Sequence, residues 1–435
     1  MAYADTLPDN VRRKARILAI GSAVSGCISE VMLDYSAIII LLFTMLHASP
    51  MVTMFSSSLT GVMGVFLLIP YAYVVDKIGL KRAVKYACMI GCTGFLMIAV
   101  SPWLGNFSIP VALAGTFTYC SQRSLYGSAW YPLLDNFLKA DERGKFFSVM
   151  RTCYMLFNGI LLFMLGILLD KKPSILILQI TIAAAGLCVL IRWFCIKQFP
   201  VDPELKTGTY RFYESLKTSI RNAPLTGFSV YQCILILGST TLLPLTLIYL
   251  RKYVQMEPGK VQLLSSIGIG GSICGYFVYG FVTRKVKLKW LELSVHLMFL
   301  ILAFLLFWLD HRMPGFDICI GAIIFFNSFA TAWLLCNNSM EYLALARPGN
   351  KTMAISFCST YSNLGAAIGR TGSSLLLGGV LLAPQWTCAG RTVSVYQSVF
   401  LISGLIAVLA LALLPVLPVL PSFVPEREDY YNPDR

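Results

Sequence analysis

Charged residues are scarce in this chain of 435 residues. Asp, Glu, Lys and Arg make up 13% of the sequence, whereas hydrophobic residues make up 57%. A soluble globular domain carries about 25% charged residues. Apolar runs of the ~20 residues that cross a bilayer recur along nearly the whole sequence. The composition therefore excludes a soluble globular protein and predicts an all-α protein with many transmembrane helices.

Several motifs of enzymes and of ATP-driven pumps are also missing. No Gly-x-x-x-x-Gly-Lys-Ser/Thr loop occurs, so nothing supports transport driven by ATP. Only three histidines are present (His47, His296 and His311), and they are too scattered for a metal site or a His-based catalytic site. Gly268–Gly275 has the spacing of a dinucleotide fingerprint, but it lies inside an apolar run, where close helix packing explains its glycines. We therefore predict no enzyme, no cofactor and no metal.

Twelve transmembrane spans are predicted, and all but one of the connections are short. The long connection, 199–224, is polar and separates an N-terminal half, 1–198, from a C-terminal half, 225–435. Six spans fall in each half, a common plan of transporters. The predicted spans are 17–46, 51–75, 83–103, 110–138, 146–169, 174–196, 225–250, 261–283, 288–309, 316–343, 352–382 and 395–420.

The basic residues, which give the chain a net charge of +14, are spread over short clusters between the apolar runs. This distribution excludes a nucleic-acid-binding patch and is typical of membrane topology signals. If the N-terminus is cytoplasmic, 26 of the 35 lysines and arginines lie on the inner side and 7 on the outer side. The asymmetry predicts that both ends of the chain face the cytoplasm.

Three short motifs resemble the major facilitator superfamily of secondary transporters. The run DKIGLKR at 76–82, between spans two and three, is similar to the superfamily's loop signature G-x-x-x-D-R-x-G-R-R-x. The run RSLYG at 123–127 is similar to the R-x-x-x-G motif of proton-coupled members, and LDYS at 33–36 to the start of some drug–proton antiporters. The resemblance covers the whole span layout. It implies a twelve-helix fold of two pseudo-symmetric halves that transports by alternating access.

The loop at 76–82 also has a physical interpretation of its own. Asp76 ends one helix and Gly79 permits a tight turn, while Lys81 and Arg82 stay in the cytoplasm. A charged turn of this kind can latch neighbouring helix ends and hold one access state closed until substrate binds. We therefore predict a gating loop, with an ordinary positive-inside loop as the alternative.

Two carboxylates, Glu30 and Asp34, lie near the middle of the first span. Their spacing places both on one face of a helix, and each ionised carboxylate at mid-bilayer costs about 2.5–3.5 kcal/mol. We therefore expect both to face a polar cavity. Two close like charges help one of them to bind a proton, so we predict proton coupling at Glu30 and Asp34, with Arg123 of span four as the counter-ion. The alternative is that the two carboxylates have a structural role and bind to groups on neighbouring helices.

Arg123 and Arg370 come from opposite halves and are predicted to bind an anionic substrate in bidentate fashion. The alternative for Arg370 is capping of backbone groups in a helix broken by glycines. Trp130, Asn337 and Asn363 are also predicted to contact the substrate, although a single polar residue in a membrane helix is more often a helix–helix hydrogen bond.

The combined prediction is a secondary active transporter of a small organic solute, coupled to protons or another cation by symport or antiport, with an anionic substrate favoured. The alternatives are a proton-coupled exporter of hydrophobic or cationic drugs, which the missing span-five motif G-x-x-x-G-P-x-x-G-G argues against, and a membrane receptor or lipid-handling protein. We expect a monomer in the inner membrane of a bacterium, whose partners are a small-molecule substrate and the lipid bilayer, not nucleic acid.

Overall fold

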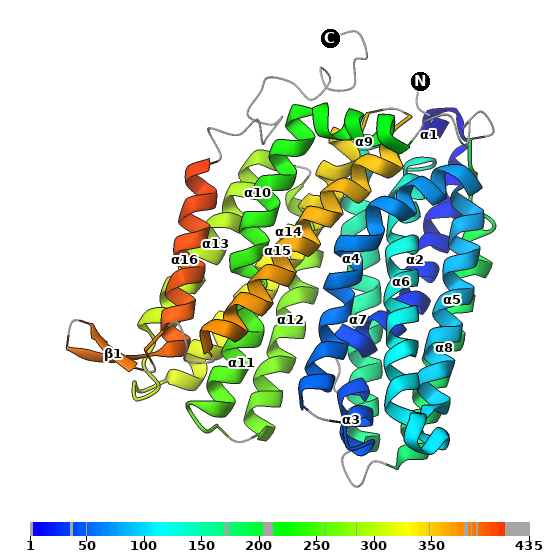
Figure 1. Cartoon of the computed structure of the whole chain (residues 1–435). Helices are drawn as coiled ribbons and strands as arrows, with labels where there is room; N and C mark the ends of the chain where they lie inside the picture. Colours follow the sequence, from blue (N-terminus) through cyan, green and yellow to red (C-terminus); the bar gives the residue numbers. More distant parts are fainter. Residues whose placement is uncertain are drawn as a thin grey trace. The chain divides into compact units, whose positions relative to one another are not determined.

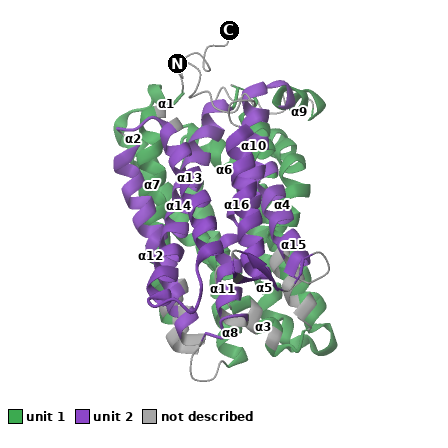
Figure 2. Ribbon diagram, turned by 90° about the vertical axis from the view of Figure 1, so that its left-hand side faces the viewer, with its two compact units in different colours: residues 1–219, 346–360 green, residues 220–345, 361–435 purple. Residues whose placement is uncertain are grey.

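The computed structural model of the chain is built almost entirely of helices (Figure 1). It describes residues 3–34, 38–48, 50–169, 174–202, 212–256, 258–283, 285–347, 349–377, 382–383, 385–388 and 390–413. By its contacts the chain divides into two compact units, coloured separately in Figure 2. Unit 1 is Met1–Ser219 with Ala346–Thr360, and unit 2 is Ile220–Leu345 with Tyr361–Arg435.

Unit 1 contains the helices of the first half of the chain. They are α1 (Tyr3–Thr6), α2 (Asp9–Asp34), α3 (Ile38–Met45), α4 (Pro50–Ile78), α5 (Leu80–Val100), η1 (Ser101–Phe107), α6 (Ser108–Asp135), η2 (Ala140–Glu142), α7 (Arg143–Leu169), α8 (Ile175–Ile196) and most of α9 (Phe212–Arg221). Within the unit, α2 packs on α7 and α8, while α6 packs on α4 and α5. The first turns of α15 also belong to unit 1.

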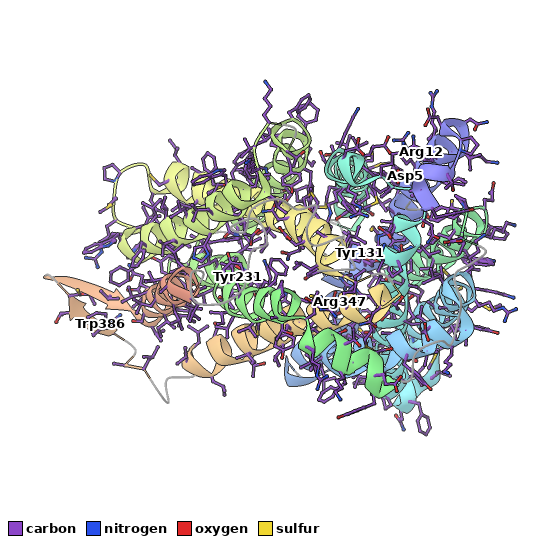
Figure 3. The ribbon with its side chains drawn as sticks, turned by 90° about the horizontal axis from the view of Figure 1, so that it is seen from above. Asp5, Arg12, Tyr131, Tyr231, Arg347 and Trp386 are labelled. Carbon is purple, nitrogen blue, oxygen red and sulfur yellow. The ribbon has the colours of Figure 1, made fainter. Side chains whose placement is uncertain are left out.

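Unit 2 contains the helices of the second half and a β-hairpin. They are α10 (Ala223–Ser239), α11 (Leu242–Lys252), α12 (Pro258–Val282), α13 (Leu288–Trp308), α14 (Phe316–Leu345), α15 (Lys351–Leu377), β1 (Gln385–Cys388), β2 (Arg391–Ser394) and α16 (Val395–Leu413). Here α14 packs on α12 and α13, and α16 packs on α10 and α13. The antiparallel strands pair Gln385 with Ser394, and the Trp386 indole N–H donates a 2.8 Å hydrogen bond to Ser398 Oγ of α16 (Figure 3).

Each predicted span coincides with one helix or with a pair of helices. The first corresponds to α2 and α3, the seventh to α10 and α11, and the other ten to one helix each. In the part of the chain that the structure describes, eight stretches are long and apolar enough to cross a membrane, with α5 and α6 joined in one of them. The number of crossings, the side on which the ends lie and the boundaries of the predicted halves stay predictions.

The division of span seven into α10 and α11 has a local cause. Pro244 lies in the first turn of α11, which begins at Leu242 after Thr241. Proline has no backbone N–H, and its ring clashes with the carbonyl of the residue four positions earlier, here Thr240. A continuous helix through this region is therefore disfavoured, and α10 ends at Ser239.

The polar connection between the predicted halves contains a helix, α9. Its Ser215 and Ser219 are buried, and Asn350 Nδ2 donates hydrogen bonds of 3.0 Å to Ser215 O and to Ser219 Oγ. Side chains on its other face, including Tyr213 and Ile220, are exposed. The helix is thus docked on its small polar face, next to the start of α15.

Candidate functional site

A buried arginine of α8 forms the centre of a charged cluster inside unit 1. The Arg192 side chain is only 2% exposed, and its Nη2 donates a 2.8 Å hydrogen bond to Oε1 of Glu30 on α2. Its Nε donates to the carbonyl oxygen of Ser22 at 3.4 Å. The Glu30 side chain is 21% exposed. Glu30 therefore forms the accessible end of this ion pair, and Arg192 the enclosed end.

The position of the Arg192 guanidinium is set by a glycine and an aromatic ring. A Cβ atom at Gly26 would lie 1.7 Å from Arg192 Nε, so the guanidinium occupies space that only a glycine leaves free. The Arg192 Cζ also lies 4.0 Å from the centroid of the Tyr126 ring on α6. A cation desolvated over an aromatic face gains about 2 kcal/mol. These contacts fix a positive charge in the interior of the unit.

Trp130 joins the same cluster through Tyr126. The two rings, one turn apart on α6, stack with their centroids 5.3 Å apart and an interplanar angle of 28°. Trp130 is 8% exposed. The structure thus brings together two of the residues predicted for the site, Glu30 and Trp130, by way of Arg192 and Tyr126.

Two further arginines act on this cluster. The charge of Arg123 acts on Glu30, and the charges of Arg123, Arg151 and Arg192 all act on Cys27, one turn before Glu30 on α2. Arg151, on α7, is 8% exposed. Three arginines are thus grouped around Glu30. The Asp34 side chain lies outside the described residues, so its pairing with Arg123 stays a prediction.

Two of the 26 basic residues counted on the cytoplasmic side, Arg192 and Arg151, are buried among the helices of unit 1. For Glu30, the ion pair is made by Arg192 rather than by the predicted counter-ion Arg123. A basic residue within a turn of a span's end usually extends to the interface, so the sequence did not indicate that Arg192 pairs with Glu30.

The signature loop connects helix ends within unit 1. Gly79 separates α4 from α5 with φ 87° and ψ 149°, and Asp76 lies in the last turn of α4. The Lys81 ammonium donates a 3.1 Å hydrogen bond to the carbonyl oxygen of Lys197, just past the end of α8. A cation at the carboxyl end of a helix complements the helix dipole. Arg82 is exposed. The contact supports a latch, and its gating role stays a prediction.

Gly79→Ala is expected to destabilise this loop. The backbone of Gly79 lies close to a region that only glycine visits without strain, so we expect a loss of about 1–3 kcal/mol in the free energy of unfolding. Thermal unfolding of the purified protein in detergent measures it. Gly270→Ala, in an open position on α12, is the control and should leave the midpoint unchanged or raise it. Equal midpoints for the two variants would show that the turn tolerates a side chain.

The remaining predicted site residues lie in unit 2. Arg370 is exposed on α15, which continues unbroken to Leu377, so capping of a broken helix at this point is wrong. Asn363 is partly exposed on the same helix. Asn337 is fully buried, with Nδ2 donating to Glu292 Oε2 at 2.8 Å and Oδ1 accepting from the Tyr279 hydroxyl at 2.6 Å. A common substrate site for Arg123 and Arg370 stays a prediction, as do the substrate contacts of Asn337 and Asn363.

Comparison with known proteins decides the family. The profile of the Major Facilitator Superfamily matches residues 18–369. The chain belongs to the Major Facilitator Superfamily. It is a multi-pass membrane protein and a secondary transporter rather than an enzyme.

Solved structures of the superfamily share its fold. The proton:xylose symporter XylE, bound to 6-bromo-6-deoxy-D-glucose, is 12% identical, with a TM-score of 0.74 over 98% of this chain and 100% of that chain. A bacterial homologue of the iron transporter ferroportin in an outward-facing state is 11% identical, with a TM-score of 0.67 over 92% and 99%. The human organic anion transporter MFSD10 is 14% identical, with a TM-score of 0.68 over 94% and 100%. The sequence has no significant match among curated proteins.

Proposed function

We propose that this transporter moves a small organic anion across the membrane by alternating access and that protons are co-transported with it. The observation that carries the proposal is the fixed guanidinium of Arg192, grouped with Arg123 and Arg151 around one described carboxylate. Guanidinium groups bind carboxylates and phosphates with charge-assisted, often bidentate hydrogen bonds. The arginine charges also disfavour a cationic drug as substrate, because like charges repel in a medium of low dielectric constant.

The coupling follows from the Glu30–Arg192 pair. An ionised Glu30 neutralises Arg192 and competes with any anion for the guanidinium. A proton bound to Glu30 removes that negative charge and makes the Arg192 guanidinium available to the substrate. Proton and anion therefore favour each other's binding, and this coupling is reciprocal. Asp34, four residues later on the same helix, is proposed to share the proton with Glu30.

The membrane orientation is part of the same proposal. With Arg151 and Arg192 removed from the cytoplasmic count, lysines and arginines still concentrate on that side. Both ends of the chain are proposed to face the cytoplasm, in a cytoplasmic membrane such as the inner membrane of a bacterium. The protein is proposed to work as a monomer, because both halves of the superfamily fold are present in one chain.

Purified protein in proteoliposomes tests the proposed function. A panel of radiolabelled mono- and dicarboxylates, phosphorylated sugars, neutral sugars and cationic dyes is screened by counterflow, with the protein-free liposome as control. We expect saturable counterflow of an anion and its accumulation when the inside of the vesicle is alkaline. Asp34→Asn should retain counterflow and lose the accumulation. Saturable flux of cations alone would overturn the anion assignment, and equal accumulation by Asp34→Asn would remove that residue from coupling.

Replacing Arg370 by glutamine tests whether the charge of this side chain binds the substrate. Arg370→Gln should weaken counterflow of the anion by more than tenfold while neutral solutes are unaffected, because a bidentate charge-assisted contact is lost. Arg13→Gln, at an exposed position on α2, is the control for a change of surface charge. Equal effects of the two variants would exclude Arg370 from anion binding.

A further inference from the structure

Unit 2 contains a buried carboxylate that the proposed function does not use. Glu292, on α13, is 1% exposed. Its Oε1 accepts a 3.0 Å hydrogen bond from Gln232 Nε2 of α10, and its Oε2 accepts a 2.8 Å hydrogen bond from Asn337 Nδ2 of α14. The other described groups that act on it are the Tyr231 hydroxyl of α10 and the Glu341 carboxylate of α14. Within the described part of unit 2, neutral donors and no cation surround this carboxylate.

A buried histidine lies one turn further along α13. His296 Nε2 is 2.7 Å from the carbonyl oxygen of Ala407 on α16. Because a carbonyl oxygen only accepts hydrogen bonds, Nε2 carries the hydrogen and the other ring nitrogen of a neutral imidazole is an acceptor. That nitrogen, Nδ1, lies 3.1 Å from the Tyr231 hydroxyl. The contact assigns the neutral ring a single tautomer.

Tyr231 therefore stands between two acceptors (Figure 3 labels it). Its hydroxyl hydrogen-bonds to His296 Nδ1, and it also interacts with the Glu292 carboxylate. A phenol has one hydrogen to donate, whereas its oxygen also accepts. With Glu292 ionised and His296 neutral, the Glu292 carboxylate and His296 Nδ1 are both acceptors. The single hydrogen of the Tyr231 hydroxyl can be donated to only one of them.

We propose that Glu292, Tyr231 and His296 form a binding site for one proton inside unit 2. A proton on Glu292 lets the carboxyl hydroxyl donate to the Tyr231 oxygen while the Tyr231 hydroxyl donates to His296 Nδ1. A proton on His296 reverses both bonds, so that Nδ1–H donates to Tyr231 and Tyr231 donates to the ionised Glu292. Either arrangement satisfies all three groups. The step takes one proton from solvent and breaks no covalent bond except the O–H or N–H bonds that exchange it.

An unsatisfied amide oxygen supports a protonated form of Glu292. Gln232 Oε1 is buried and accepts no hydrogen bond from the described residues. Rotation of this amide would offer the single carboxyl hydrogen of Glu292 an acceptor in place of the Tyr231 oxygen. The remaining ionisable groups near the site are Glu341 on α14 and Tyr279 of α12, whose hydroxyl donates to Asn337. Neither of these described groups is a cation.

Spectroscopy of the whole purified protein in lipid nanodiscs tests the site without a substrate. The chain has three histidines, so nitrogen-15 histidine labelling gives few signals, and His296→Gln assigns the one of interest. Infrared difference spectra between alkaline and acidic buffer report the carbonyl stretch of newly protonated carboxyls. We expect one such band to be lost in Glu292→Gln, and the His296 signals to shift with the same midpoint as that band.

Matched variants keep the test decisive. Tyr231→Phe should separate the midpoints of the carboxyl band and the His296 signal, whereas Tyr279→Phe, which also removes a buried hydroxyl, should leave them together. These two variants decide the matter even if Glu292→Gln does not fold. A wild-type band that persists in Glu292→Gln would overturn the proposal, as would spectral changes produced by sodium and not by acid. Since no substrate is added, the result is independent of whether the protein transports an anion.

Discussion

Gly26→Ala is expected to abolish transport, because a single methyl group at this position takes the place of the Arg192 guanidinium. The new Cβ would lie 1.7 Å from Arg192 Nε and about equally close to the rest of the group, so the side chain has to leave the Tyr126 ring and the Glu30 carboxylate. Overpacking of a well-packed interior costs about 1–3 kcal/mol before the lost ion pair is counted. Thermal unfolding and proteoliposome uptake measure the two effects.

The same helix supplies the control for this prediction. Gly21→Ala on α2 places a Cβ 3.7 Å from Cys195 Sγ, an ordinary contact. Replacing a helix glycine by alanine in such a place stabilises a helix by roughly 0.5–1 kcal/mol, so this variant should be at least as stable as the wild type and fully active. If Gly26→Ala were as stable and as active as Gly21→Ala, transport would not require Arg192 in its observed position.

Glu30→Gln is expected to destabilise the protein more than Arg192→Gln does. The two partners differ in exposure: the arginine side chain is 2% exposed and the carboxylate 21%. Removing one member of a buried ion pair costs about 3–5 kcal/mol, because the partner is left as an uncompensated charge. Glu30→Gln leaves the enclosed guanidinium uncompensated, whereas Arg192→Gln leaves a carboxylate that reaches the surface of the unit and can take up a proton.

The double variant isolates the interaction. Glu30→Gln combined with Arg192→Gln removes both charges, so part of the lost stability should return, and the coupling energy of the pair follows from the cycle of four proteins. Transport should remain lost in the double variant if Arg192 binds the anion. A double variant as unstable as the sum of the single ones would show that the pair contributes little, and full activity would exclude Arg192 from the substrate site.

Most helices were predictable to within a few residues because their cause is local. An exception is α2, which begins at Asp9 and not at 17. A backbone that crosses lipid has to satisfy its own N–H and C=O groups, and a helix does so within one segment. An apolar run of sufficient length therefore both indicates a transmembrane helix in the sequence and causes the segment to be helical. Even the break between α10 and α11 has a local origin in Pro244, although the prediction did not use it.

The candidate site was only partly predictable, because its partners are distant in sequence. Glu30 was found as a charge in an apolar run, but its partner Arg192 lies 162 residues away and looked like a residue at the end of a span. Gly26 was indistinguishable from any other helix glycine. The role of Glu292 was missed because it stands near the basic cluster after span eight, and only the folded unit shows that α10 and α14 enclose it.

The amino-acid sequence alone determined that this is a helical membrane protein, and its motifs indicated the superfamily, since these depend on hydropathy and on residues close together in the chain. The tertiary structure decided which charges meet. Helix packing placed a guanidinium in the space above a glycine and a carboxylate between two amides. Such contacts depend on which faces of distant helices pack together, and a local sequence pattern does not predict this packing.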